Sequence, residues 1–268
     1  MVKRLIVYGL LGMALAIVLS TQYKVDRPDA EMVIIVKAPE KPRHPYQEEH
    51  ERMLYPVVRI TSDSGTGSGV IIATTDFAIA VSAEFTDEHR WIQIITAAHV
   101  VEDQSVVDIE LYDSTIITGT VVITDTVKDL ALIKPEINTD KIYKARLAPG
   151  NYEAYLFSPV WTIGCSLGLE PRPSYGHITH IEKSNQCLSV SICGYEISAP
   201  ILPGNSGGPV YDARTYEVIG IAVWVKVYAG QLVTTMAGVV PINEIYEFLD
   251  SHTFVTLSVN SDAEVAEK

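Results

Sequence analysis

The feature that most constrains the fold is a long succession of short segments rich in β-branched residues, which begins at Val57. Clusters of Gly, Asp, Ser and Thr separate these segments, as is typical of strands joined by turns. The first set reads VVRI, SGVIIAT, RWIQIIT, VVDIELY, IITGTVVIT and DLALI. The second set reads PVWTIG, YGHITHIE, YEISA, YEVIGIAVWV and LVTTMAGVV. Many short strands with almost no helix predict an all-β sandwich or barrel.

A stretch without strand periodicity divides the two sets near residues 135–149. We therefore expect one barrel over about 53–138 and another over about 150–240, and a chain of 268 residues can hold two small barrels that share a cleft. PINEIYEFLDSH, residues 241–252, predicts an amphipathic helix that begins with proline. The polar, acidic residues 253–268 read as a frayed tail.

The amino terminus differs in character from the rest of the chain. Lys3 and Arg4 precede the uncharged residues 5–23, whose length is close to the roughly 20 residues that span a bilayer. Residues 1–23 are either a cleaved signal peptide, cut near Thr21, or an uncleaved signal-anchor held by its basic end. The length of the apolar run favours the anchor, and under both interpretations the remainder of the chain is exported.

Residues 24–52 are rich in charge and proline, which predicts a semi-extended polar linker. Past Pro45, the segment QEEHERML predicts a short helix that leads into the barrel domain. That domain is expected to cover residues 53–252.

Net charge and cysteine content narrow the function further. A formal charge of -13 with no basic stripe argues against nucleic-acid binding, which needs clustered Lys and Arg.

Cys187 and Cys193 bracket a run that can form a hairpin, so a local disulfide between them is one possibility in an oxidising compartment; free thiols are the other. Cys165 would then stay single. His177 and His180 lie near these cysteines, but the spacing matches no standard zinc pattern, and we expect no metal.

The segment PGNSGGPV, residues 203–210, carries the strongest chemical signal. Ser206 lies between Asn205 and a pair of glycines, in a loop whose tight bend requires glycine. The backbone N–H groups of Gly204 and Ser206 can converge on one point, which is the arrangement of an oxyanion hole. The alternative is an ordinary glycine-rich turn between strands.

Two further segments supply groups that would activate a serine. His99 lies in TAAHV after a predicted strand, and Asp129 opens the apolar strand DLALI. A carboxylate at a barrel edge can accept the Nδ1–H of a histidine and so fix the tautomer of the ring. Taken separately, His99 reads by default as a structural histidine, and Asp129 reads as a cap or turn residue before a strand.

Together, TAAHV, DLAL and GNSGGP, in the order His, Asp, Ser, resemble the trypsin-like peptidases and, within them, the HtrA/Deg branch. GTGSGVII, the segment around IGCSLG and the strand EVIGIAV are similar to further segments of that branch. The resemblance implies a chymotrypsin-like fold of two six-stranded antiparallel β-barrels, with residues 53–252 as a serine protease domain. It also implies an acyl-enzyme mechanism without a cofactor, in which His99 is general base and then acid, Asp129 orients it, Ser206 is the nucleophile, and Gly204 and Ser206 are the oxyanion donors.

The chain departs from the resembled families in three places. Asn205 stands where digestive trypsin-like enzymes have the aspartate that pairs with a newly cut amino terminus, so we expect no activation by zymogen cleavage. Cys165 and Ser166 replace the usual Asn-Pro of the branch. Too few residues follow the predicted helix for a PDZ domain, so recognition of a substrate carboxyl terminus by such a domain is not expected.

Partners are expected to be protein or peptide substrates and, through an uncleaved amino terminus, the membrane; the oligomeric state is left open. The resemblance implies a primary specificity pocket formed by Pro200, Ile221, Ala222 and Val223, which contains no acid and therefore favours a small or medium aliphatic residue before the scissile bond. Two other functions remain: a non-catalytic binding module on the same fold, and a protease that cuts one specific site such as the linker 24–52.

Overall fold

The computed structural model describes residues 44–63, 65–73, 92–136, 142–182 and 194–251. The apolar segment 5–23, most of the linker, and the cysteine pair Cys187 and Cys193 lie outside the described residues. Over the described ranges, no helix has the length and apolar character needed to cross a membrane.

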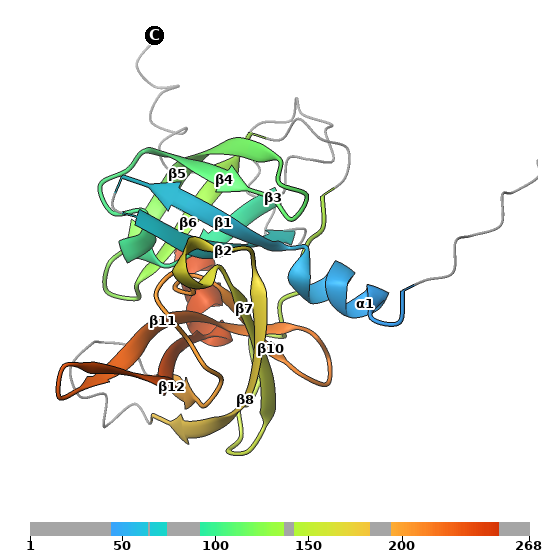
Figure 1. Ribbon diagram of the computed structural model, residues 1–268, viewed down its shortest axis with the longest axis vertical. Coiled ribbons are helices and arrows are strands. Elements are labelled where there is room, and N and C mark those ends of the chain that lie inside the picture. The colour runs from blue at the N-terminus through green and yellow to red at the C-terminus, as the bar shows by residue number, and fades with distance from the viewer. Residues whose placement is uncertain (1–43, 64, 74–91, 137–141, 183–193, 252–268) are drawn as a thin grey trace, which may run out of the picture. The chain divides into compact units, whose positions relative to one another are not determined.

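The first barrel, barrel 1, closes with the strand order β1-β2-β3-β6-β5-β4, and every neighbouring pair is antiparallel (Figure 1). Its strands are β1 (Val57–Ser62), β2 (Gly65–Ala73), β3 (Ile92–Thr96), β4 (Val106–Glu110), β5 (Ile116–Asp125) and β6 (Leu130–Pro135). All six were expected from short runs of strand-forming residues separated by turn residues.

The second barrel, barrel 2, closes with the order β10-β11-β12-β9-β8-β7, again with antiparallel neighbours. Its strands are β7 (Pro159–Gly164), β8 (Arg172–Ile181), β9 (Tyr195–Ile197), β10 (Pro209–Asp212), β11 (Val218–Tyr228) and β12 (Gln231–Pro241). The predicted fold of two six-stranded antiparallel barrels is confirmed. The short strand β10 was not anticipated as a separate strand, because its four buried residues directly follow the glycine-rich segment and form too short a run to recognise.

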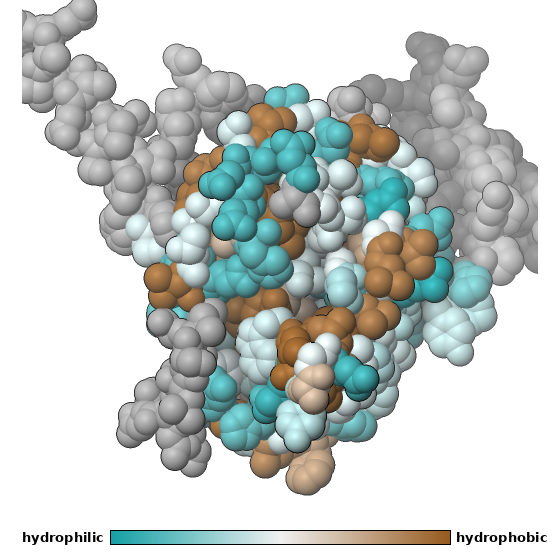
Figure 2. Space-filling model, turned by 60° about the vertical axis from the view of Figure 1, so that its left-hand side comes forward, coloured by the Kyte–Doolittle hydropathy of each residue, from teal (hydrophilic) through white to brown (hydrophobic). Residues whose placement is uncertain are grey.

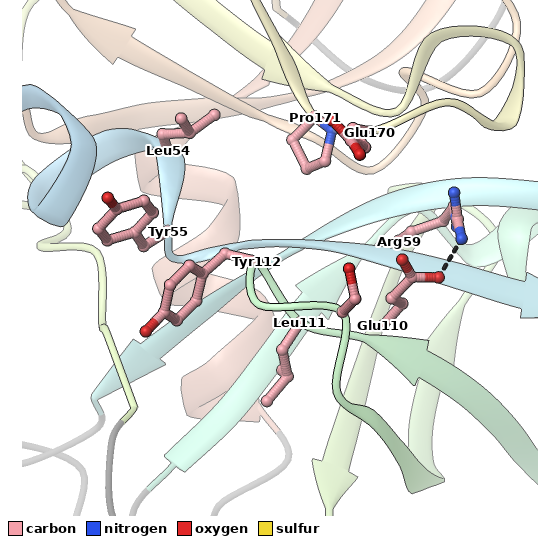
Figure 3. Close-up of a pocket in the computed structure, with 9 residues that line it drawn as sticks. Leu54, Tyr55, Arg59, Glu110, Leu111, Tyr112, Glu170 and Pro171 are labelled. Atoms are coloured by element: carbon pink, nitrogen blue, oxygen red, sulfur yellow. Dashed lines mark hydrogen bonds and ion pairs between the residues drawn. The ribbon is translucent and has the colours of Figure 1, made fainter.

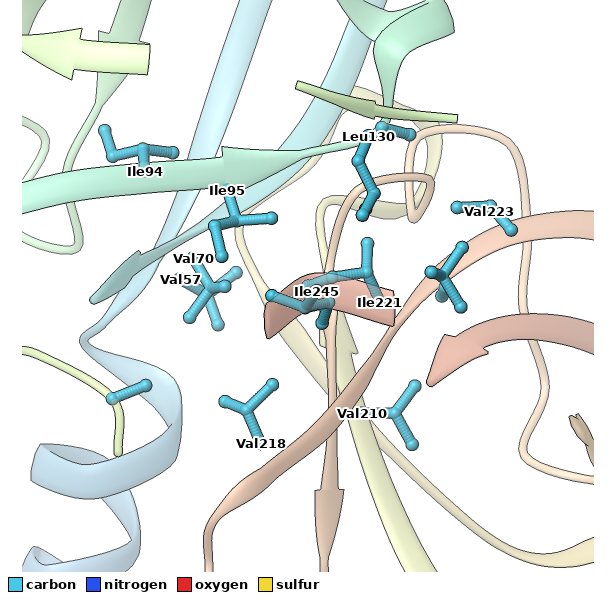
Figure 4. Close-up of a cluster of buried hydrophobic side chains, with 14 of the residues drawn as sticks. Val57, Val70, Ile94, Ile95, Leu130, Val210, Val218, Ile221, Val223 and Ile245 are labelled. Atoms are coloured by element: carbon cyan, nitrogen blue, oxygen red, sulfur yellow. The ribbon is translucent and has the colours of Figure 1, made fainter. Parts of the chain in front are cut away.

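Burial follows the sequence pattern. In β4 exposed and buried residues alternate, as in a half-buried strand, whereas the first four residues of β6 are all buried. Figure 4 shows part of the core, to which both barrels contribute: Val57, Val70, Ile94, Ile95 and Leu130 from barrel 1, Val210, Val218, Ile221 and Val223 from barrel 2, and Ile245 from the last helix.

Both predicted helices are present. Helix α1 (Gln47–Glu49) continues into a π-helical turn, His50–Leu54, and the phenolic hydroxyl of Tyr211 donates to the carbonyl of Met53 at 2.9 Å. The second helix covers 242–251, one residue later than expected at its start, because Pro241 still belongs to β12. Its residues Glu244 and Glu247 form ion pairs with Lys128, which precedes β6 in barrel 1.

Candidate active site

His99 lies in a short 3₁₀ turn, Ala98–Val100, directly after β3. Ala97, Ala98 and Val100 are buried, so the turn is anchored while the side chain of His99 stays 45% exposed. Small residues around the histidine therefore fix its backbone and leave its ring accessible from solvent.

Asp129 comes directly before β6 and contacts His99 at two points. Its Oδ1 accepts the backbone N–H of His99 at 3.0 Å, and its Oδ2 lies 2.8 Å from Nδ1 of the ring. A carboxylate only accepts hydrogen bonds, so Nδ1 carries the proton and Nε2 of a neutral ring is left as the proton acceptor. That is the tautomer a general base needs.

The same contact also affects the pKa of the His99 ring. The hydrogen bond to Asp129, together with the negative charges of Asp129 and Glu102, raises the pKa of His99 above its usual value although burial lowers it. The carboxylate therefore stabilises the imidazolium that forms whenever Nε2 takes up a proton.

Ser206 lies in the loop between residue 203 and β10, which bends at two glycines with positive φ: 95° at Gly204 and 83° at Gly207. A Cβ on Gly207 would come within 2.2 Å of both the Ser68 carbonyl oxygen and Thr96 Oγ1. The carbonyl of Ser206 also accepts the N–H of Ser68 at 2.8 Å. The serine loop of barrel 2 is thus packed against β2 and β3 of barrel 1, and β3 leads into the His99 turn.

The peptide groups around Ser206 have a defined direction. The carbonyl of Pro203 accepts the N–H of Leu167 at 2.7 Å, and that of Asn205 accepts the N–H of Gly208 at 2.9 Å. In a trans peptide the C=O and N–H point in opposite directions. The N–H groups of Gly204 and Ser206 consequently point away from these partners, and within the described part of the chain neither has an acceptor.

The predicted specificity residues are arranged differently from one another. Pro200 is exposed, Ile221 and Ala222 are fully buried, and Val223 is 5% exposed. Ala222 holds the serine loop through its backbone, since its carbonyl accepts the N–H of Gly207 at 2.7 Å and its N–H donates to Gly208 at 2.9 Å. The side chains of Ile221 and Ala222 belong to the core, so a substrate would meet their segment of β11 at its backbone; the pocket itself stays a prediction.

Two serines that the sequence did not single out contact the loop through their hydroxyls. Ser68 Oγ donates to the carbonyl of Gly204 at 2.6 Å, and Ser166 Oγ donates to Oδ1 of Asn205 at 2.6 Å. Ser68 lies in GTGSGVII, which was noted only for its resemblance to a family segment, and Ser166 was noted only as a departure from the usual Asn-Pro.

Cys165, His177 and His180, which the sequence noted, take no part in the described contacts of His99 with Asp129. Cys165 is a buried free thiol, and burial raises its pKa to about 11, so it is protonated at neutral pH. His177 and His180 lie on β8. Among the described residues, no three metal-binding side chains come close enough to hold an ion.

A cavity of about 160 Å³ lies away from His99, beside β1 and β4. Figure 3 shows its lining, in which Arg59 forms an ion pair with Glu110; the other guanidinium nitrogen of Arg59 donates to the carbonyl of Gly168 at 2.9 Å. Figure 2 shows that apolar residues form separate patches among polar ones on one face of the molecule. The described residues that line the cavity include no histidine, so it offers no second serine–histidine pair.

Comparison with known proteins agrees with this geometry. The model of the trypsin-like peptidase domain family matches residues 67–221, which include His99, Asp129 and Ser206. The chain is 31% identical over 166 residues to the putative serine protease HhoB of Synechocystis, covering 59% of this chain and 34% of HhoB. It is 31% identical over 166 residues to the serine protease Do-like HtrA of Bacillus subtilis, covering 60% of this chain and 33% of that protein.

The chain thus spans about a third of the length of these relatives. Among solved structures, the HtrA-type protease AlgW with tripeptide has a similar fold, with a TM-score of 0.61 at 23% identity over 78% of this chain and 63% of AlgW. On the strength of the matched residues and the double barrel, the chain belongs to the trypsin-like peptidase family, with HtrA-type serine proteases among its relatives.

Proposed function

We propose that this protein is an HtrA-like serine endopeptidase that hydrolyses peptide bonds through His99, Asp129 and Ser206. The observation that carries the proposal is the double contact of Asp129 with His99, which leaves Nε2 as a base on the barrel edge against which the Ser206 loop packs. A serine hydroxyl is too weak a nucleophile without such a base.

The chemistry follows from these groups. His99 takes the proton of Ser206 while Oγ attacks the substrate carbonyl, and the N–H groups of Gly204 and Ser206 donate to the resulting oxyanion. The imidazolium then protonates the leaving amine, and the C–N bond breaks to leave an acyl-enzyme. A water molecule then gives a proton to His99 and attacks the ester; as the C–O bond breaks, the imidazolium returns that proton to Ser206 Oγ, which releases the carboxylic acid product and restores the serine.

No zymogen switch is required in this proposal. Asn205 is 1% exposed, and its side chain is uncharged and accepts a hydrogen bond from Ser166. A buried neutral amide has no need of an ammonium partner, whereas a buried carboxylate would. We therefore expect full-length protein to be active without cleavage before Val57.

Substrates, in this proposal, are proteins or peptides with a small or medium aliphatic residue before the scissile bond, and the protease domain acts outside the cytoplasm. The location outside the cytoplasm is supported by the apolar residues 5–23, which in this proposal serve as an anchor or a signal peptide. Intact-mass measurement of exported protein distinguishes an uncleaved anchor from a cleaved signal peptide. A peptide-library profile dominated by cleavage after Lys or Arg would refute the aliphatic preference.

Active-site labelling tests the central claim. Wild-type protein should react with a fluorophosphonate probe, Ser206→Ala should not, and the control Ser105→Ala, which alters an exposed serine, should label like wild type. Wild-type protein that is folded yet inert towards the probe and towards casein would instead favour a non-catalytic binding module. Discrete self-shortening within residues 24–52, with no casein cleavage, would favour the single-site protease.

A further inference from the structure

Ser68 is a fully buried residue of β2 whose hydroxyl joins two segments of barrel 2. Its Oγ donates to the carbonyl of Gly204 at 2.6 Å and accepts the N–H of Cys165 at 2.8 Å. These partners are 136 and 97 residues away in the chain. A single hydroxyl is therefore hydrogen-bonded both to the serine loop, which contains Gly204, and to Cys165, directly after β7.

The backbone of Ser68 makes two further contacts, one to the loop that contains Ser206 and one to β3 of barrel 1. Its N–H donates to the carbonyl of Ser206 at 2.8 Å, and its carbonyl accepts the hydroxyl of Thr96 at 2.6 Å. Thr96 ends β3, three residues before His99. Ser68 is thus hydrogen-bonded on one side to the loop of the proposed nucleophile and on the other to the strand that positions the proposed base.

Ser166 holds the next residue of the loop. Its hydroxyl donates to Oδ1 of the buried Asn205 at 2.6 Å, while the adjacent N–H of Leu167 donates to the carbonyl of Pro203. Leu167 reaches this position with φ at 58°, a left-handed conformation that is unfavourable for a residue with a Cβ. Such strain persists where surrounding contacts hold the backbone in place.

We propose that Ser68 and Ser166 are positioning residues that hold residues 203–205 so that the N–H groups of Gly204 and Ser206 stay available to the oxyanion. This inference rests on the proposed function. Neither serine touches the substrate: Ser68 acts through the carbonyl of Gly204, and Ser166 acts through the side chain of Asn205. Loss of either hydroxyl lets the loop rotate about its glycine φ angle and withdraw one of the two donors from the oxyanion.

The test compares Ser166→Ala, Ser166→Thr and Ser68→Ala with the control Thr162→Val. Thr162 is a buried residue of β7 whose hydroxyl, among the described buried side-chain atoms, lacks a hydrogen-bond partner, so its loss disturbs no such contact. The readouts are kcat and KM on a peptide amide, the Ki of a peptide boronic acid whose tetrahedral adduct places an oxygen in the oxyanion site, and the melting temperature.

Ser166→Ala should lower kcat about tenfold and Ser68→Ala about 100-fold, below or at the loss that removal of one complete oxyanion donor causes. KM should stay within about twofold, since only the transition state loses a contact, and the boronic acid Ki should rise by the same factor as kcat falls. Ser166→Thr, which keeps the hydroxyl, should recover most of kcat, and Thr162→Val should match wild type. The acid limb of the pH profile should not move, because His99 is unaltered.

Folded Ser166→Ala and Ser68→Ala proteins with wild-type kcat, or with raised KM and unchanged kcat, would overturn the inference while leaving the proposed function intact. If Ser68→Ala melts below the assay temperature, the Ser166 pair decides by itself, because Ser166 is only half-buried. Wild-type protein without hydrolytic or fluorophosphonate reactivity would overturn the proposed function and this inference with it.

Discussion

Asp129 accepts hydrogen bonds from both the main chain and the ring of His99: Oδ1 accepts the backbone N–H, and Oδ2 accepts Nδ1–H. The backbone contact fixes where the histidine stands, and the ring contact fixes its tautomer. Asp129 does this with φ at 51°, in the left-handed region that Asp and Asn tolerate better than other residues with a Cβ.

Asp129→Asn is therefore the clean test of the proposed carboxylate, since it keeps the backbone preference and removes the charge. We expect kcat to fall by about 10³–10⁴ with little change in melting temperature. Asp103→Asn is the matched control, because Asp103 is an exposed aspartate that also has positive φ, at 59°. Equal activity of Asp129→Asn and Asp103→Asn would remove Asp129 from the mechanism.

The pH dependence of kcat/KM should report His99. The hydrogen bond and charge of Asp129 raise the pKa of His99 above 6.5, and a general base works only when neutral. Activity should accordingly be low in acid and rise with pH through a midpoint above 6.5. Glu102→Gln removes one of the charges that raise this pKa and should shift the midpoint downwards, as measured by pH–rate profiles and by NMR titration of the ring. A midpoint below 6.5 in wild type would contradict the described geometry.

Gly207 is predicted to be irreplaceable for reasons of space as well as conformation. An alanine there would meet the carbonyl oxygen of Ser68 at 2.2 Å, so Gly207→Ala should displace the serine loop and lower activity by at least about 100-fold. Gly230→Ala is the control: its φ of 76° is similar, but nothing lies within 4 Å of the new Cβ. That variant should lose only about 1–2 kcal/mol of stability from strain and stay active.

A buried acid in β10 should matter for stability. Asp212 is 1% exposed and accepts hydrogen bonds from the hydroxyl of Tyr152 at 2.9 Å and from the side chain and backbone of Arg214. Asp212→Ala leaves these donors without their acceptor and should lower the free energy of unfolding by about 2–4 kcal/mol in urea titrations. Arg214→Ala should cost less than Asp212→Ala, because the Arg214 side chain is exposed and Asp212 keeps the donors Tyr152 Oη and the backbone N–H of residue 214.

The same carboxylate links stability to pH. Although burial favours the neutral form, the hydrogen bonds from Arg214 and Tyr152 lower the pKa of Asp212 below its usual value. A carboxylate whose pKa is lower in the folded state than in the unfolded state stabilises the folded protein at pH values above the unfolded-state pKa. This stabilisation is lost as the pH falls through the folded-state pKa. Acid unfolding of Asp212→Asn should be less steep than that of wild type; an equally steep curve would contradict this role.

Local patterns in the sequence predicted the architecture, whereas the roles of the three proposed reactive side chains came from the resemblance of TAAHV, DLAL and GNSGGP to the trypsin-like peptidases. Short runs of strand-forming residues mark strands, and small residues around His99 and glycines around Ser206 mark sharp turns. The strand β10 escaped, since its four buried residues directly follow the glycine-rich segment and form too short a run to recognise.

The supporting hydroxyls could not be predicted in the same way. Ser68 and Ser166 meet partners that lie 136 and 39 residues away, and serine is common on surfaces and in turns, so nothing local distinguishes them. The predicted pocket wall was uncertain for a different reason, because the same local pattern fits two structures. Apolar residues at 221–223 suit a pocket and a core equally well, and the side chains of Ile221 and Ala222 are fully buried in the core.

The pairing of Lys128 with Glu244 and Glu247 bears on the order in which the molecule can be completed during synthesis. Chains are made from the amino terminus, and the helix that binds Lys128 is the last described element to leave the ribosome. The residue next to Asp129 thus acquires its partners only after both barrels have been translated. A nascent chain that ends before this helix already holds every group of the proposed triad, yet lacks the contact that ties the two halves together beside it.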